Sequence, residues 1–137
     1  MLSRRKFSAC ALCAVTGFSA SSVGAEAGEE QQAPGVRRII LQRTEFPGSQ
    51  YETLLVLAEI DAGVDVARHT HPGIESAYVL EGGLELSVQG EPTRTLKVGD
   101  GNQIQPWTPH SARNGDKLTR IAVTYVLEKG KPIASPA

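Results

Sequence analysis

Cysteine is scarce in this sequence and confined to one place. The chain has two cysteines, Cys10 and Cys13, both near the N-terminus. Their C-x-x-C spacing would suit a redox pair, but they lie in the apolar core of a predicted export signal and would be removed with it. After cleavage the protein would hold no cysteine, which excludes disulfides and thiolate metal ligands.

Long apolar runs and basic surfaces are also lacking. The apolar stretch from Ala9 to Ala20 is too short and too rich in Ser, Gly and Thr to span a bilayer stably. Of the 14 Lys and Arg residues, three lie in the segment 1–25, which holds no acid, so the remainder carries a net charge of −4. This argues against nucleic acid or an anionic membrane as a partner. The sequence also has no P-loop, nucleophile elbow or dinucleotide fingerprint.

The N-terminal segment 1–25 predicts export. A basic start is followed by the apolar run, and Val23-Gly24-Ala25 offers a signal peptidase site before Glu26. The start, Ser3-Arg4-Arg5-Lys6-Phe7, is similar to the twin-arginine signal S-R-R-x-F-L-K, whose last two positions are not matched. A general secretory signal and a short N-terminal anchor helix are the alternatives. We expect a periplasmic or secreted bacterial protein, with residues 26–35 as a polar linker.

The rest of the chain favours strands over helices. Aromatic residues make up only 5%, whereas Val, Ile and Leu are plentiful and Gly and Pro recur throughout. Strand signals recur about every 8–12 residues with no helical stretch between them, which predicts an all-β sandwich or barrel. The expected strands span residues 37–43, 51–60, 64–70, 76–80, 84–88, 93–98, a short segment ending near 104, 110–113 and 118–127. Residues 129–137 show no periodicity and are expected to form a tail.

The chain has three histidines, His69, His71 and His110. His69 and His71 are two residues apart in an expected strand, so their side chains point to the same face. Two imidazoles side by side in an interior need partners for their nitrogens, and a divalent metal ion serves this purpose well. Glu75 follows a break at Pro72-Gly73, where the chain can reverse and return a carboxylate to the pair. The alternative is a metal-free His/Glu hydrogen-bond network, and the residues alone do not place His110 beside the others.

The spacing of these residues resembles the first motif of the cupin superfamily, G-x5-H-x-H-x3,4-E-x6-G. It is matched at every fixed position by Gly63, His69, His71, Glu75 and Gly82. The resemblance implies a single-domain cupin jelly-roll barrel, or double-stranded β-helix, over residues 36–128. It also implies a metal ion bound by His69, His71, Glu75 and His110, and a homodimer.

The second cupin motif, G-x5-P-x-G-x2-H-x3-N, is matched at its ends by Gly99, His110 and Asn114. Gln105 and Trp107 replace its usual proline and glycine. Because tryptophan adopts the backbone angles of a turn glycine only under strain, we expect the loop before His110 to take a different turn. Trp107 would then lie at the mouth of the barrel, where it either stacks on a substrate or plugs the barrel end.

Three histidines and one carboxylate around an octahedral ion would leave two positions open for water, oxygen or a chelating substrate. We therefore expect a metalloenzyme, dioxygenase-like or a redox-neutral isomerase or lyase, that acts on a small chelating metabolite. The alternative is a non-catalytic binding module for a small metabolite or a metal ion. Glu75, with a second role in proton transfer, and Tyr78, with a hydroxyl inside the barrel, are the candidate catalytic residues. Tyr78 is equally well read as a core or interface tyrosine.

The predicted export route bears on the metal. Nitrogen and oxygen sites generally bind copper and zinc more tightly than iron or manganese. A twin-arginine substrate folds before export, so its metal would be chosen in the cytoplasm and then trapped. This favours Fe(II) or Mn(II), with Zn, Ni or Cu as alternatives. Of the arginines, Arg68 is expected to point outward, and Arg113 and Arg120 either lie on a solvated surface or meet an anionic substrate.

Overall fold

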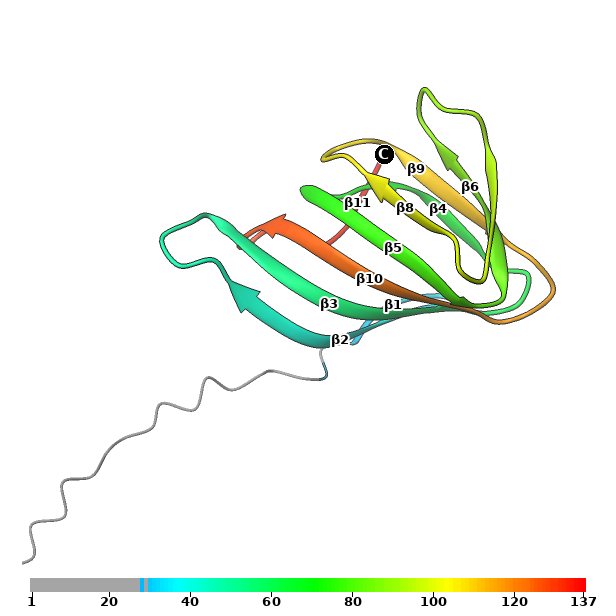
Figure 1. Cartoon of the computed structure of the whole chain (residues 1–137), viewed down its shortest axis with the longest axis horizontal. Helices are drawn as coiled ribbons and strands as arrows, with labels where there is room; N and C mark the ends of the chain where they lie inside the picture. The colour runs from blue at the N-terminus through cyan, green and yellow to red at the C-terminus, as the bar shows by residue number, and fades with distance from the viewer. Residues whose placement is uncertain (1–27, 29) are drawn as a thin grey trace, which may run out of the picture.

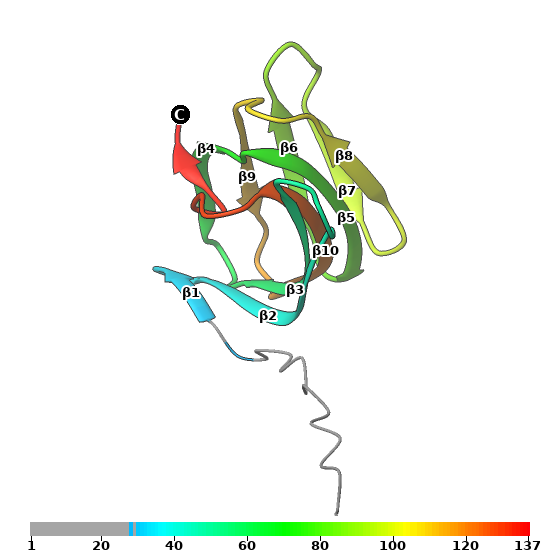
Figure 2. The same cartoon turned by 90° about the vertical axis from the view of Figure 1, so that its left-hand side faces the viewer.

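The protein is an antiparallel β-barrel formed by two sheets that face each other (Figures 1 and 2). The structure is a computed structural model, and it describes Gly28 and residues 30–137. The predicted signal and its cleavage site lie outside the described residues. In the described part of the chain, no helix is long and apolar enough to cross a membrane.

The described strands follow the turn spacing of the sequence. They are β1 (Glu30–Ala33), β2 (Val36–Glu45), β3 (Tyr51–Ile60), β4 (Asp65–Thr70), β5 (Gly73–Glu81), β6 (Gly83–Val88), β7 (Arg94–Lys97), β8 (Gly101–Ile104), β9 (His110–Asn114), β10 (Thr119–Glu128) and β11 (Ser135–Pro136). One sheet has the order β1-β2-β3-β10-β5-β8, and the other has the order β11-β4-β9-β6-β7. The expected all-β jelly roll is confirmed.

Both ends of the described chain are more ordered than the sequence predicted. Glu30–Ala33, within the expected linker, pairs with the start of β2 as β1. Ser135 and Pro136, within the expected tail, pair with Thr70 and His69 of β4 as β11. Both segments are too short to show a strand period, so only their pairing with a neighbouring strand reveals them.

The interior holds two groups of buried apolar side chains. One group, near the β3–β4 turn, contains Val79, Leu84 and Leu86. The other, near the start of β3 and the end of β10, contains Leu54, Val56 and Leu127, which are at most 1% exposed. Buried residues alternate with less buried ones along β6 and most of β3, as expected for a sheet with one buried face.

Asn114 and Gly82, the last residues of the second and first motifs, stabilise turns of this barrel. The Asn114 side-chain amide donates to the carbonyls of Ile60, Asp61 and Lys117, and its Oδ1 accepts from Thr119 Oγ1 at 2.7 Å. Asn114 thereby ties β9 to the end of β3 and the start of β10. Gly82 has a φ of +74°, and a Cβ there would lie 2.5 Å from the carbonyl oxygen of Leu118. Only glycine meets both conditions.

Candidate metal centre

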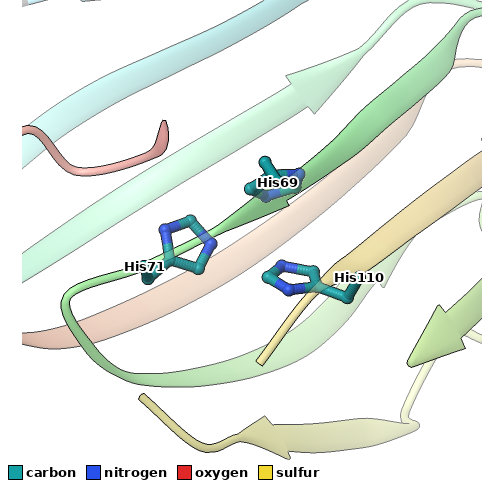
Figure 3. Close-up of side chains that lie close together, drawn as sticks. All are labelled: His69, His71 and His110. Carbon is teal, nitrogen blue, oxygen red and sulfur yellow. The ribbon is translucent and has the colours of Figure 1, made fainter. Parts of the chain in front are cut away.

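Four side chains from both sheets meet inside the barrel. His69 is in β4, His71 directly follows β4, and His110 is the first residue of β9. His69 and His110 are direct partners across the β4–β9 pair. Glu75 comes from β5 of the opposite sheet, where it lies between Ile104 and Tyr125. Figure 3 shows the three imidazole rings gathered at the facing ends of β4 and β9.

A β-bulge sets the direction of the β4 side chains. Val66 pairs with Ala112, but the next matched pair is His69 with His110, so β4 has an extra residue between them. The bulge lets Val66 and His69 both line the interior, although they are three residues apart. Arg68 is exposed as predicted, and its guanidinium donates to Gln89 Oε1 at 2.7 Å.

Each imidazole is oriented by a backbone carbonyl. The Nδ1 atoms of His69 and His110 lie 2.7 Å from the Ala67 oxygen and 2.9 Å from the Thr108 oxygen. Nδ1 of His71 contacts the carbonyl of Ile133, in the segment that leads into β11. A carbonyl only accepts, so each Nδ1 carries the proton and each neutral ring keeps its lone pair on Nε2.

The three Nε2 atoms are available to a common ligand. One nitrogen from each ring lies within 4.8 Å of the others. Nε2 of His71 and Nε2 of His110 are both buried, and Nε2 of His110 has no hydrogen-bond partner. Nε2 of His71 contacts the Glu75 carboxylate. A buried lone pair without a partner is costly. A cation at the centre of the group would satisfy these nitrogens at once.

The Glu75 carboxylate completes this donor set. Its Oε2 lies 2.9 Å from His71 Nε2 and 3.9 Å from His110 Nε2. Neighbouring ligands of an octahedral ion, with bonds of about 2.1 Å, are separated by about 3 Å. The imidazole and carboxylate donors, their spacing and the unpaired Nε2 of His110 therefore fit a divalent metal ion.

Burial sets the protonation states that metal binding needs. Burial lowers the pKa of His69 to about 4, and His110 and His71 add to this shift. Burial also lowers the pKa of His110, against the opposing effects of the Thr108 carbonyl and Glu75. Burial alone would raise the pKa of Glu75, but the nearby histidines outweigh it, and the net shift is downward. At neutral pH, His69 and His110 are neutral donors and Glu75 is ionised.

His69 and His110 line an interior cavity of about 70 Å³. Most of its wall is apolar, and its other polar lining residues are Arg38, Asn102 and Tyr125. Burial and then the Glu75 carboxylate raise the pKa of the Tyr125 hydroxyl. The sequence reasoning missed all three residues. Strand parity could have found Arg38, because it has the same parity as the buried residues Val36 and Ile40 of β2.

A model of the cupin domain matches residues 56–128, just over half of the chain. The protein belongs to the cupin family. A search of curated proteins finds no significant match. The family assignment confirms the resemblance that the two sequence motifs indicated.

Solved structures show the same fold at low sequence identity. KdgF from Halomonas sp. is 23% identical, with a TM-score of 0.58, over 74% of this chain and 89% of its own. The polyketide cyclase RemF from Streptomyces resistomycificus is 23% identical, with a TM-score of 0.60, over 82% of this chain and 80% of its own. The DMSP lyase DddQ from Ruegeria pomeroyi DSS-3 is 24% identical, with a TM-score of 0.57, over 65% of this chain. This cupin spans only 44% of DddQ.

Two expectations about this cupin are corrected. Tyr78 lies on the outer face of β5, is 51% exposed and does not line the histidine cavity, because its parity is opposite to that of Glu75. Trp107 does adopt the glycine-like angle, with a φ of 60°, so the loop keeps that turn instead of finding another. Such a conformation costs about 1–2 kcal/mol.

The turn at Trp107 is held from both sides. Its backbone N–H donates to the carbonyl of His71 at 2.8 Å, and the ammonium of Lys131 lies 5.1 Å from its ring centroid. The side chain is half exposed and does not line the cavity. Arg113 and Arg120 lie on the surface, where they contact Asp65 and Glu59 respectively.

Proposed function

We propose that this cupin is an exported metalloenzyme that binds one divalent ion through His69, His71, Glu75 and His110 and acts on a small chelating metabolite. The observation that supports it most strongly is the cluster of three imidazoles whose nitrogens lie within 4.8 Å of one another, with the buried Nε2 of His110 lacking a hydrogen-bond partner. A bound ion would supply Lewis acidity and open positions for substrate oxygens. The proposal of export to the periplasm or beyond comes from the N-terminal segment 1–25.

The residues of the cavity divide the remaining work. The backbone carbonyls of Ala67, Thr108 and Ile133 hold the three rings in one tautomer. Tyr125 keeps its proton, so its hydroxyl acts as a neutral neighbour of Glu75 and not as a base. The apolar wall limits water around the reacting atoms.

Glu75 is the candidate for proton transfer because its ionised carboxylate faces the cavity. Dioxygenase-like and redox-neutral chemistry are both compatible with this donor set. Two of the fold neighbours are named as a lyase and a cyclase, and these activities belong to those proteins. They keep an isomerase or lyase reaction as a serious alternative to an oxygenase.

The metal we favour is Fe(II) or Mn(II). The donors are nitrogen and oxygen atoms without sulfur, a set that also accepts Zn, Ni and Cu. The preference comes from the twin-arginine-like signal, since folding in the cytoplasm would load the site there. Copper or zinc in the protein from its native compartment would overturn this preference without removing the site.

The test is the metal content of the mature protein purified from the periplasm of its native host, with His71→Ala beside it. About one equivalent of metal in the wild type, lost in the variant, supports the proposal. The expected metal is Fe or Mn, and oxygen-uptake and lyase assays on small chelating substrates then decide the reaction. The absence of stoichiometric metal from the wild type would refute the proposal and favour a metal-free binding module.

A further inference from the structure

Arg38 places a positive charge inside the barrel. It lies on β2 opposite Ala58, and it lines the same cavity as His69, Glu75 and His110. Its charge is close enough to act on both His69 and His110, whose pKa values it helps to lower. A guanidinium held among apolar side chains is costly unless it finds an acceptor.

Arg38 differs from its neighbours in having no carboxylate partner in a described ion pair. Its chain neighbour Arg37 points outward and pairs with Glu59 at 2.8 Å. Arg38 makes no ion pair with any side chain that the structure describes. Its named neighbour in the cavity is the Tyr125 hydroxyl, which Glu75 also approaches. Because a guanidinium has five N–H donors, Arg38 keeps donor capacity directed at the cavity.

A second donor faces the same space. Asn102 is on β8 opposite Ala77, and it also lines the cavity. Its Nδ2 is buried and has no hydrogen-bond partner. Two donor groups with unused capacity, in one cavity, call for a ligand rich in acceptor oxygens.

Charge and size narrow the class of ligand. Arg38 and Glu75 carry opposite charges that offset each other, so a bound divalent ion would leave the cavity positive. A cavity of about 70 Å³ admits only a small ligand. The far wall, with Val79, Leu84 and Leu86, is apolar and suits a short hydrocarbon end.

We infer that the ligand of this cavity is a small hydroxy or oxo acid of three or four carbons, whose carboxylate is bound by Arg38 and Asn102. Its second oxygen faces the three histidines. A planar guanidinium with several donors matches a carboxylate better than any other small anionic group of this size. This inference rests on the proposed metal function and adds the substrate class and two specificity residues to it.

The test is calorimetric titration of the metal-containing protein with lactate and with lactamide. The two ligands have the same shape, and only lactate carries a negative charge. We expect lactate to bind at least about tenfold more tightly, as charge-assisted bonds do. In Arg38→Gln this preference should disappear, whereas Arg113→Gln, which removes an exposed charge on β9, should keep it. Thermal unfolding checks that both variants are folded, and Arg38→Lys, which keeps the charge, should retain part of the preference.

Three results would overturn the inference: no lactate binding, equal affinity for lactate and lactamide in the wild type, or unchanged lactate preference in Arg38→Gln. Any of these, with one equivalent of metal present, leaves the proposed function standing. If lactate binds to a protein that holds no metal, and this binding depends on Arg38, the inference stands and the proposed metal function fails. Equal affinity for the two ligands in the wild type would overturn the inference even if a variant fails to fold.

Discussion

Replacing Glu75 by Gln tests the metal centre from both sides. In the neutral tautomer, His71 Nε2 and Glu75 Oε2 are both acceptors, yet they lie 2.9 Å apart. Without an ion, this contact is unfavourable or requires a proton on His71. The amide of Glu75→Gln would donate to Nε2 and would also remove a buried charge. The metal-free variant should therefore be more stable than the metal-free wild type.

The size of the effect follows from the contact. One new neutral hydrogen bond contributes about 1 kcal/mol, which would raise the melting temperature by about 4 °C for a domain of this size. Metal affinity should change in the opposite direction, because the only anionic ligand is lost. Loss of a residue that only orients a metal ligand lowers metal affinity about 10- to 100-fold. Loss of Glu75, a direct ligand, should therefore lower metal affinity by at least about 100-fold.

Differential scanning fluorimetry of the metal-free proteins and calorimetric titration with Mn(II) measure the two effects. Glu81→Gln is the matched control, since Glu81 is an exposed residue at the end of the same strand. It should leave metal affinity unchanged. Lower stability of metal-free Glu75→Gln together with unchanged Mn(II) affinity would refute the reasoning. The buried pair would then be a protonated histidine and a carboxylate with no place for an ion.

Four further predictions follow from the structure. Deletion of residues 133–137 removes β11 and the Ile133 carbonyl that holds His71, so metal affinity by titration should fall about 10- to 100-fold; unchanged affinity would mean that the tail does not orient the ring. The pKa of His69 is about 4 in the folded protein against an ordinary 6.5, so the unfolded state binds more protons between these values. The metal-free protein should therefore lose about 1–2 kcal/mol from this residue between pH 7 and pH 4, after allowance for its partial exposure, and urea midpoints that stay constant over this range would contradict the assignment. Trp107→Gly should raise the free energy of unfolding in urea by up to about 1 kcal/mol, because glycine adopts the positive φ without strain. A loss of stability would show that the contact of the Trp107 ring with Lys131 outweighs this strain. Leu55 is an exposed apolar residue of β3. If the protein is the expected homodimer and pairs through this face, Leu55→Glu should shift it toward monomer in light scattering. A wild-type monomer would end that prediction.

The sequence alone was enough to predict the architecture and the position of most candidate ligands. The regular spacing of turn residues predicted the strands, because local backbone preferences and side-chain alternation are encoded over a few residues. The same alternation placed His69 and His71 on one face. Motif spacing then indicated Glu75 and His110, which the fold brings to the same point.

Only the tertiary structure decided what surrounds those ligands. Arg38, Asn102 and Tyr125 come from three different strands, and their meeting depends on pairings over long sequence distances. The segment that leads into β11 reached His71 through a contact that no local pattern announces. Trp107 adopted its strained angle because the contacts of the loop outweigh the local cost. Local preference determines which face a side chain occupies, whereas the global packing of the barrel determines what that side chain meets.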